Sequence, residues 1–335
     1  MAVIEARPTR TADLRTISLV GAALVAAGVA LRALDAAGVA SLRNFLIVFA
    51  SLLVEALPFI VLGAAVSAMI EVFVPASVFA RLARLPRGLQ QPIAGLGGFA
   101  FPVCECGSVP VARRLVAKGM SPAAAITFML AAPILNPVVL VATAVAYRGR
   151  DILWPMVLGR AGLGLLVAMV AAWVVGAGRG RDILRSGGRP SGELHDHGEV
   201  PEARWTEYFG HLASDFTMLA RYLVIGAAIA AALQTFVPQQ VLGAVAGTPI
   251  LNVAALMILA SLLSLCSESD AFVAASFVQF GMSAQLAFLV AGPMIDAKLA
   301  VLYTGTFRKG FALTLTAVVF AATLAGALWF QVVFG

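Results

Sequence analysis

The stretch FPVCECGSVP, from Phe101 to Pro110, places two cysteines, a carboxylate and a glycine between two prolines in otherwise apolar sequence. A second stretch in the other half of the chain, SLCSESDAF from Ser264 to Phe272, carries the third cysteine. Proline interrupts helices, and non-helical backbone at membrane depth must be buried in protein or line a cavity. We therefore expect the two stretches to face each other inside a membrane, at the centre of a transport site.

The composition excludes an ordinary soluble domain. Of 335 residues, 61% are hydrophobic and only 12% are charged, whereas soluble domains carry about a quarter charged residues. Several apolar runs reach the roughly 20 residues that cross a bilayer as a helix, so we predict an all-α integral membrane protein. The net charge of +6 comes from basic residues in short loops, which is typical of cytoplasmic anchoring and not of nucleic-acid binding. Three cysteines cannot form a disulfide framework.

Apolar runs predict the order of the helices. Residues 17–34 predict an extra spanning helix with a cytoplasmic N-terminus, because the run is longer than that of the alternative, a cleaved signal peptide. Residues 76–89 predict an interfacial amphipathic helix on the cytoplasmic side, with arginines against an apolar face. The remaining runs predict spans at 45–74, 122–147 and 152–175, with the cysteine-bearing segment at 91–118.

One long polar segment divides the chain. Residues 178–205 are rich in Gly, Arg and Glu, which predicts a flexible cytoplasmic linker. His195 and His197 in this segment have no further ligands nearby in sequence, so a solvated loop explains them better than a metal site.

The second half of the chain repeats the first. FIVLGAAVSAMIEVFVP, from Phe59, matches YLVIGAAIAAALQTFVP, from Tyr222, and Gly-Met-Ser at 119–121 recurs at 281–283. AAPILN, ending at Asn136, recurs as AGPMID, ending at Asp296. Three blocks in one order indicate an internal duplication, as in many secondary transporters. The predicted domains are an N-terminal region 1–43, a first repeat 44–177, the linker 178–205 and a second repeat 206–335.

Charge placement predicts that the two repeats are inverted. If segment 91–118 crossed the membrane once, Arg113, Arg114 and Lys118 would lie outside, against the positive-inside rule. A re-entrant hairpin returns them to the cytoplasm, and the matching segment 249–281, which has no Lys or Arg, then enters from outside. Each repeat thus has three spans and one re-entrant hairpin, with arms of about 12 residues that reach the midplane. A simple model of nine spans is the alternative.

The two hairpin tips concentrate the chemistry. Thiolates bind Cu(I), Zn²⁺ and trivalent arsenic, although inert packing is the alternative for any single cysteine. Charged residues inside spans mark substrate or proton pathways, and the alternative is a structural pair such as Asp296–Lys298 or Asp215–Arg221. The thiol candidates as soft-metal or arsenic ligands are Cys104, Cys106 and Cys266. The candidate pathway residues are these three with Glu105, Gly107, Ser108, Pro110, Asn136, Ser267, Glu268, Asp270, Asp296 and Lys298.

These residues resemble a known family. FPVCECGSVPVARRL, the following GMSPAAAITFMLAAPILNPVVL and the paired GMS and GP blocks resemble bacterial predicted permeases typified by YraQ and ArsP, over roughly residues 45–335. The resemblance implies an inner-membrane permease, and its ArsP branch implies efflux of trivalent organoarsenicals through cysteine thiols, here Cys104 and Cys106 with Cys266 as a third. The extra N-terminal helix and the His-Asp-His segment are not part of the family pattern.

Three functions follow. The first is a secondary permease, not an enzyme, that exports a thiophilic solute and is coupled to protons. The second is a permease for an anion or another small solute, with structural cysteines. The third is a membrane thiol–disulfide oxidoreductase, which would need a reactive pair, commonly CxxC instead of the CxC present here. The sequence contains no GxxxxGK[ST] motif, so ATP is not expected as the direct energy source. No cofactor is expected. The expected partners are the lipid bilayer, the solute, protons and a second copy of the chain.

Overall fold

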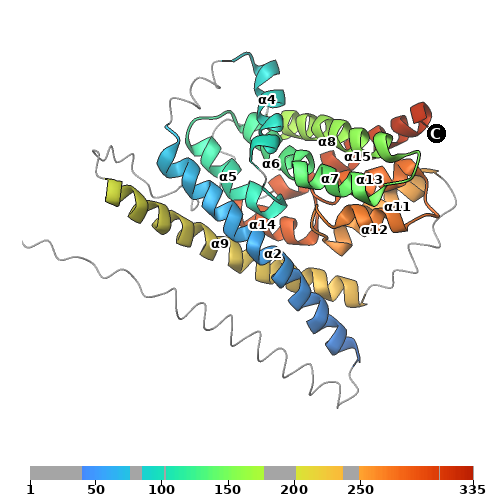
Figure 1. The fold of residues 1–335 in the computed structure, drawn as a ribbon, viewed down its shortest axis with the longest axis horizontal. Coiled ribbons are helices and arrows are strands. Elements are labelled where there is room, and N and C mark those ends of the chain that lie inside the picture. The colour runs from blue at the N-terminus through green and yellow to red at the C-terminus, as the bar shows by residue number, and fades with distance from the viewer. Residues whose placement is uncertain are drawn as a thin grey trace, which may run out of the picture.

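The computed structural model describes residues 40–75, 85–101, 103–176, 201–236, 249–308 and 310–334. The predicted N-terminal helix at 17–34, the linker histidines and most of the predicted amphipathic helix at 76–89 lie outside these ranges. The secondary-structure elements within these ranges are α-helices, so the prediction of an all-α membrane protein is confirmed (Figure 1).

The helices of the two halves follow one order. The first half contains α2 (Ala40–Phe73), α4 (Arg87–Ala100), α5 (Glu105–Ala117), α6 (Pro122–Leu135), α7 (Pro137–Ala146) and α8 (Leu153–Gly176). The second half contains α9 (Pro201–Phe236), α11 (Pro249–Leu263), α12 (Asp270–Ser276), α13 (Met282–Ala291), α14 (Ala297–Thr306) and α15 (Phe311–Phe334). A long helix opens each series, and a helix of 24 residues closes each one. The inverted orientation of the halves stays a prediction.

Five described stretches are long and apolar enough to span a membrane. They are Ser41–Phe73, Pro122–Ala146, Leu153–Gly176, Arg204–Thr235 and Phe311–Phe334. In α8, Trp154 and Trp173 are 67% and 66% exposed. They lie 19 residues apart, or about 28 Å along the axis, which matches the distance between the aromatic belts of a bilayer.

The predicted span at 122–147 is divided in two. α6 ends at Leu135 and α7 begins at Pro137, with Asn136 between them. Pro137 has no N–H to donate and fits the first position of a new helix, while the Asn136 side chain accepts from the Val138 amide and starts that helix. The corresponding break separates α13 from α14, where Asp296 accepts from the Leu299 amide.

The two hairpins differ in length. Three of their arms have 13 to 15 residues, close to the predicted 12. The fourth arm, α12, has only seven. Ser264 ends α11 with a φ of 49°, a value that non-glycine residues rarely adopt, and the polar residues after it delay the next helix until Asp270.

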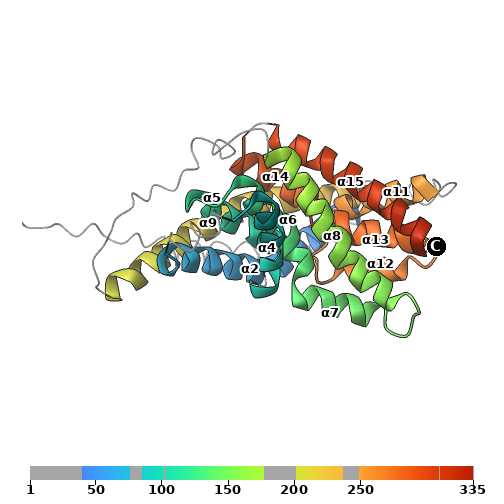
Figure 2. The same cartoon turned by 90° about the horizontal axis from the view of Figure 1, so that it is seen from above.

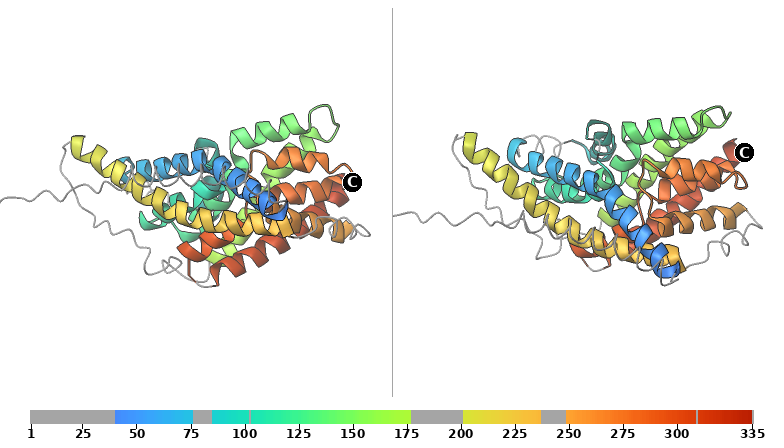
Figure 3. Two further views of the ribbon diagram at one scale, coloured as in Figure 1. Left: turned by 90° about the horizontal axis from the view of Figure 1, so that it is seen from below. Right: turned by 60° about the horizontal axis from the view of Figure 1, so that its bottom comes forward.

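Two groups of helices make up the molecule. α2 and α9 lie side by side along much of their length, and α5 and α14 pack on them (Figure 3). α4, α6, α8, α11, α13 and α15 form the remaining bulk, with α7 and α12 at one edge (Figure 2). Both cysteine-bearing breaks lie where the two groups meet.

Candidate functional site: two cysteine-bearing helix breaks

The first break lies between α4 and α5. Cys104 has extended backbone and precedes the first residue of α5, Glu105. Both side chains are almost fully buried, as is Cys106. Gly107 follows at a point where α5 crosses α2, and a Cβ atom there would lie 2.9 Å from the Cα atom of Gly63. The break can therefore sit this close to α2 only because both positions are glycine.

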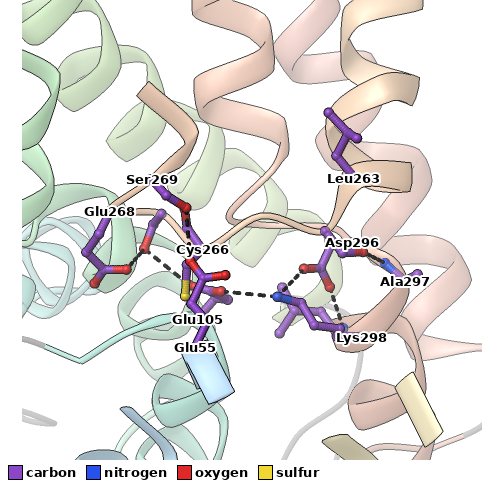
Figure 4. Close-up of polar contacts among 12 residues, drawn as sticks. Glu55, Glu105, Leu263, Cys266, Glu268, Ser269, Asp296, Ala297 and Lys298 are labelled. Atoms are coloured by element: carbon purple, nitrogen blue, oxygen red, sulfur yellow. Dashed lines mark hydrogen bonds and ion pairs between the residues drawn. The ribbon is translucent and has the colours of Figure 1, made fainter. Parts of the chain in front are cut away.

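The second break lies between α11 and α12. Cys266 and Ser267 are buried within it. The Cys266 carbonyl accepts from the Ser269 hydroxyl at 3.1 Å and from the Asp270 amide at 3.0 Å, which folds the break into a compact turn. The Ser264 hydroxyl accepts from the Ala297 amide at 3.2 Å, so the second break is also attached to the start of α14 (Figure 4).

The two breaks meet, as predicted, although 162 residues separate them. Ser267 Oγ lies 3.2 Å from Glu105 Oε2 and 3.5 Å from Glu268 Oε2. A serine hydroxyl has one proton and can donate to only one of these carboxylates at a time. Ser269 donates to Glu55 of α2 at 3.0 Å, so a third carboxylate from another helix borders the same turn (Figure 4).

Lys298 lies between two carboxylates. Its Nζ atom is 3.8 Å from Glu105 Oε1 and 3.5 Å from Asp296 Oδ2. All three side chains are buried, and neither of these two oxygens has a hydrogen-bond partner among the described residues. Lys298 thus joins α5 of the first half to α14 of the second through charge attraction in a region of low dielectric.

Of the two structural pairs considered as alternatives, one is present and one is wrong. Asp296 and Lys298 do pair, two residues apart at the start of α14. Asp215, however, pairs with Arg114 at 3.2 Å, and Arg221 is exposed on another face of α9. The sequence suggested Arg221 because it is near Asp215 on the same helix. Arg114 comes instead from α5, whose basic side chains reach α9 only in the folded chain.

The remaining candidate residues divide into two kinds. Asn136 is a buried helix cap, and its side chain accepts from the Val138 amide of α7 and not from either break. Ser108 donates to the Glu105 carbonyl at 2.9 Å, and Pro110 cannot donate to the Cys106 carbonyl because it has no N–H. Both residues therefore shape the first turns of α5.

One residue of the site was missed. Arg160 of α8 is fully buried, and its Nη2 atom lies 2.7 Å from Asp270 Oδ2 and donates to the Ser267 carbonyl at 3.1 Å. Its Nη1 atom donates to Thr143 of α7 at 2.8 Å. The signal was visible, since Arg160 is the only charged residue between Leu153 and Gly176, and a lone charge within a span predicts a buried functional contact.

The cysteines are free thiols, all three of them buried. Across the described ranges, no group of three or more His, Cys, Asp and Glu side chains is arranged to hold a metal ion. The thiols therefore line the two breaks without forming a preassembled metal centre.

Comparisons with known proteins identify the family. Residues 41–332 match the model of the ArsP_1 family, described as predicted permease. The chain belongs to this permease family. It is 37% identical over 282 residues to UPF0718 protein YcgR of Bacillus subtilis, covering 84% of this chain and 95% of that protein. It is 34% identical over 277 residues to a putative two-component membrane permease complex subunit of Streptococcus mutans, covering 82% and 90%. No solved structure matches.

The site of this permease contains more carboxylates than cations. Glu105, Asp270 and Asp296 are buried and Glu55 and Glu268 are half-buried, whereas the buried cations beside them are Lys298 and Arg160. Arg160 compensates Asp270, and Lys298 is shared. Acidic side chains therefore outnumber basic ones where the two breaks meet.

Proposed function

We propose that this membrane permease is a secondary transporter that exports a small thiophilic solute between its two cysteine-bearing breaks. The solutes that fit are trivalent arsenic compounds, organoarsenicals included, and soft metal ions. The observation that carries the proposal is the contact of Ser267 with Glu105, because it joins two breaks from opposite halves of the chain. Cys104, Cys106 and Cys266 belong to these breaks and would supply the soft ligands.

Thiol exchange with trivalent arsenic suits transport. When a thiol displaces hydroxide from arsenic, an S–As bond forms, an As–O bond breaks and the thiol proton leaves with the hydroxide as water. No oxidant is needed, and water reverses the step when the solute leaves. The carboxylates beside the thiols would accept and return protons during binding.

The proposal includes a topology. The two halves are inverted repeats with the predicted domain limits, and the N-terminus lies on the cytoplasmic side of an inner membrane. Transport is coupled to protons. The predicted assembly is a homodimer. The repeated element order and the basic residues of the first half support it. A cysteine introduced beside Met282, in a chain without native thiols, should react with an impermeant reagent from outside. Labelling only from the cytoplasm would contradict the inverted arrangement.

The thiol role is tested by serine substitution. A bacterial strain sensitive to arsenicals, antimonials and soft metals should gain resistance to one of these classes when it expresses the permease. Cys104→Ser, Cys106→Ser and Cys266→Ser should each reduce that resistance at unchanged protein level, and the triple variant should abolish it. Ser276→Ala, on the exposed part of α12, is the matched control and should transport normally. Full resistance in the triple variant would exclude thiol contact.

An anion permease with structural cysteines is the second candidate. Lys298 and the N-terminus of α5 favour it, because both place positive potential at the first break. For this function, uptake by the triple serine variant would equal that of the natural protein, and Lys298→Gln would abolish it. The remaining alternative, a thiol–disulfide oxidoreductase, predicts a reversible disulfide in a redox titration.

A further inference from the structure

The two long helices at the start of each half pack on different partners. α2 packs along α5, the second arm of its own hairpin. α9 packs along α14, which follows the break between α13 and α14 in its own half (Figures 1 and 3). In the predicted repeat α2 corresponds to α9, but α5 corresponds to α12 and α14 corresponds to α7. The equivalent helices therefore have non-equivalent contacts.

Glycines mark both contacts. Gly63 of α2 lies against Gly107 of α5, as described above. Gly226 of α9 is the repeat counterpart of Gly63, and a Cβ atom there would lie 2.8 Å from the Cα atom of Lys298 on α14. Along the same pair of helices, Gly305 of α14 leaves room for the ring of Tyr222. Small residues allow helix backbones to approach closely without interlocked side chains.

The sequence repeat identifies the residues of α2 and α7 that correspond to the contacts between α9 and α14. Phe59 and Tyr222 are equivalent, as are Asn136 and Asp296, which lie 160 positions apart. The contact of Gly226 with Lys298 then corresponds to Gly63 with Val138. The contact of Tyr222 with Gly305 corresponds to Phe59 with Val145.

Neither corresponding contact is made in this structure. Val138 and Val145 of α7 are 57% and 53% exposed, and Val141, on the same face of the helix, is 62% exposed. α7 packs instead on α6, α8 and α12 through its opposite side. The face on which α2 would lie by analogy with α9 and α14 is thus apolar and uncovered by the described helices.

We infer that this structure is one of two states of the transport cycle, and that α2 moves from α5 onto the Val138–Val145 face of α7 in the other. By the same exchange, α9 leaves α14 and packs on α12. When each of two inverted repeats adopts the conformation that the other had, the central site opens first to one side of the membrane and then to the other. The inference rests on the proposed inverted repeat and names the helix movement that would accompany transport.

Polar contacts at the end of α5 hold α2 in the present state. Lys118 donates to the carbonyls of Ile70, Glu71 and Val74 at 2.8, 2.6 and 2.7 Å. Arg114 lies 3.3 Å from Glu71. These contacts satisfy the last carbonyls of α2, which lie at the end of the membrane span, where water can replace them when α2 moves.

Cross-linking tests the movement without any solute. In membranes containing a chain without native cysteines, Phe59→Cys with Val145→Cys should form a cross-link with a short bifunctional thiol reagent. Tyr222→Cys with Gly305→Cys reports the present state and should also react, since removal of the ring makes room for the new side chain. Phe59→Cys with Leu158→Cys, an exposed position on α8, is the control and should not react. A reactive 222–305 pair with an unreactive 59–145 pair would overturn the inference.

A bulky substitution tests the movement in the protein with its native thiols. Val145→Trp should leave expression and thermal stability unchanged, because the side chain is exposed in this state, but should reduce transport at least tenfold by blocking the other state. Leu158→Trp should transport normally. Normal transport by Val145→Trp would also overturn the inference. Cross-linking of 59 with 145 in a strain that gains no arsenical or metal resistance would support the movement and reject the proposed solute.

Discussion

The two cysteine-bearing breaks are anchored in opposite ways. The second break is fixed at its tip, where buried Arg160 holds both Ser267 and Asp270 against α7 and α8. At the tip of the first break, Glu105 accepts from Ser267 at 3.2 Å and pairs with Lys298 at 3.8 Å, and both partners come from the second half of the chain. The helix that follows this break is fixed at its other end, through Arg114 and Lys118. Two breaks that both contain cysteine are therefore anchored to different parts of the molecule, one to α7 and α8 and the other, through the end of α5, to α2 and α9.

The largest expected effect on stability comes from removing the arginine that anchors the second break. Arg160→Leu leaves the buried Asp270 carboxylate without its cation, which should lower the free energy of unfolding by about 3–5 kcal/mol. Denaturant or SDS unfolding of the purified protein measures this. Arg160→Leu combined with Asp270→Leu should recover much of the loss, because no uncompensated charge remains. Equal losses in the single and double variants would show that Arg160 does not anchor the tip through Asp270.

A smaller effect should follow from separating the first break from α2. Gly63→Ala places a methyl group against the backbone of Gly107, and the overpacking should destabilise the protein by about 1–3 kcal/mol. Gly162→Ala in α8 is the matched control, because a Cβ atom there meets nothing within 4 Å. It should be neutral or stabilise the helix by up to about 1 kcal/mol. Thermal unfolding of both variants in one detergent decides whether the close approach matters.

The helix caps of the two halves allow a sharper comparison. Asn136→Ala removes one cap and should cost about 1 kcal/mol. Asp296→Ala removes the equivalent cap and also a partner of Lys298, so its effect on unfolding should be larger. Asp296→Asn keeps an oxygen for the Leu299 amide and separates the two contributions. If Asn136→Ala and Asp296→Ala have equal effects, the ion pair contributes nothing measurable.

The smallest expected effect concerns the end of α2. Glu71→Gln gives this position the residue found at its repeat counterpart, Gln234, and removes the charge opposite Arg114. Because Glu71 is partly exposed and Arg114 keeps Asp215, the loss should be about 0.5 kcal/mol or less. The same variant should increase the cross-linking of residue 59 with residue 145, since α2 leaves α5 more readily. A decrease in that cross-linking would argue against a holding role for these contacts.

Some of the site could be predicted because local chemistry determines it. Pro137 and Asn136 end one helix and start another whatever surrounds them, and the polar residues from Ser264 to Ser269 cannot continue α11 as an apolar span. The interval between Trp154 and Trp173 is likewise a property of one helix. The pairing of Arg160 with Asp270 and of Arg114 with Asp215 could not be predicted, because the residues of each pair lie more than 90 positions apart in sequence.

The sequence by itself determined a helical membrane permease, the two cysteine-bearing breaks and the residues that lie at them. Polarity and proline act within one or two turns, so these features follow from neighbouring residues. Only the tertiary structure decided that α2 lies on α5 while α9 lies on α14, and that Lys298 reaches Glu105. The physical reason is that in a bilayer both the lipid-facing and the buried sides of a helix are apolar. Hydrophobic pattern therefore does not specify its partner, which is chosen by glycine contacts and buried charges between distant segments.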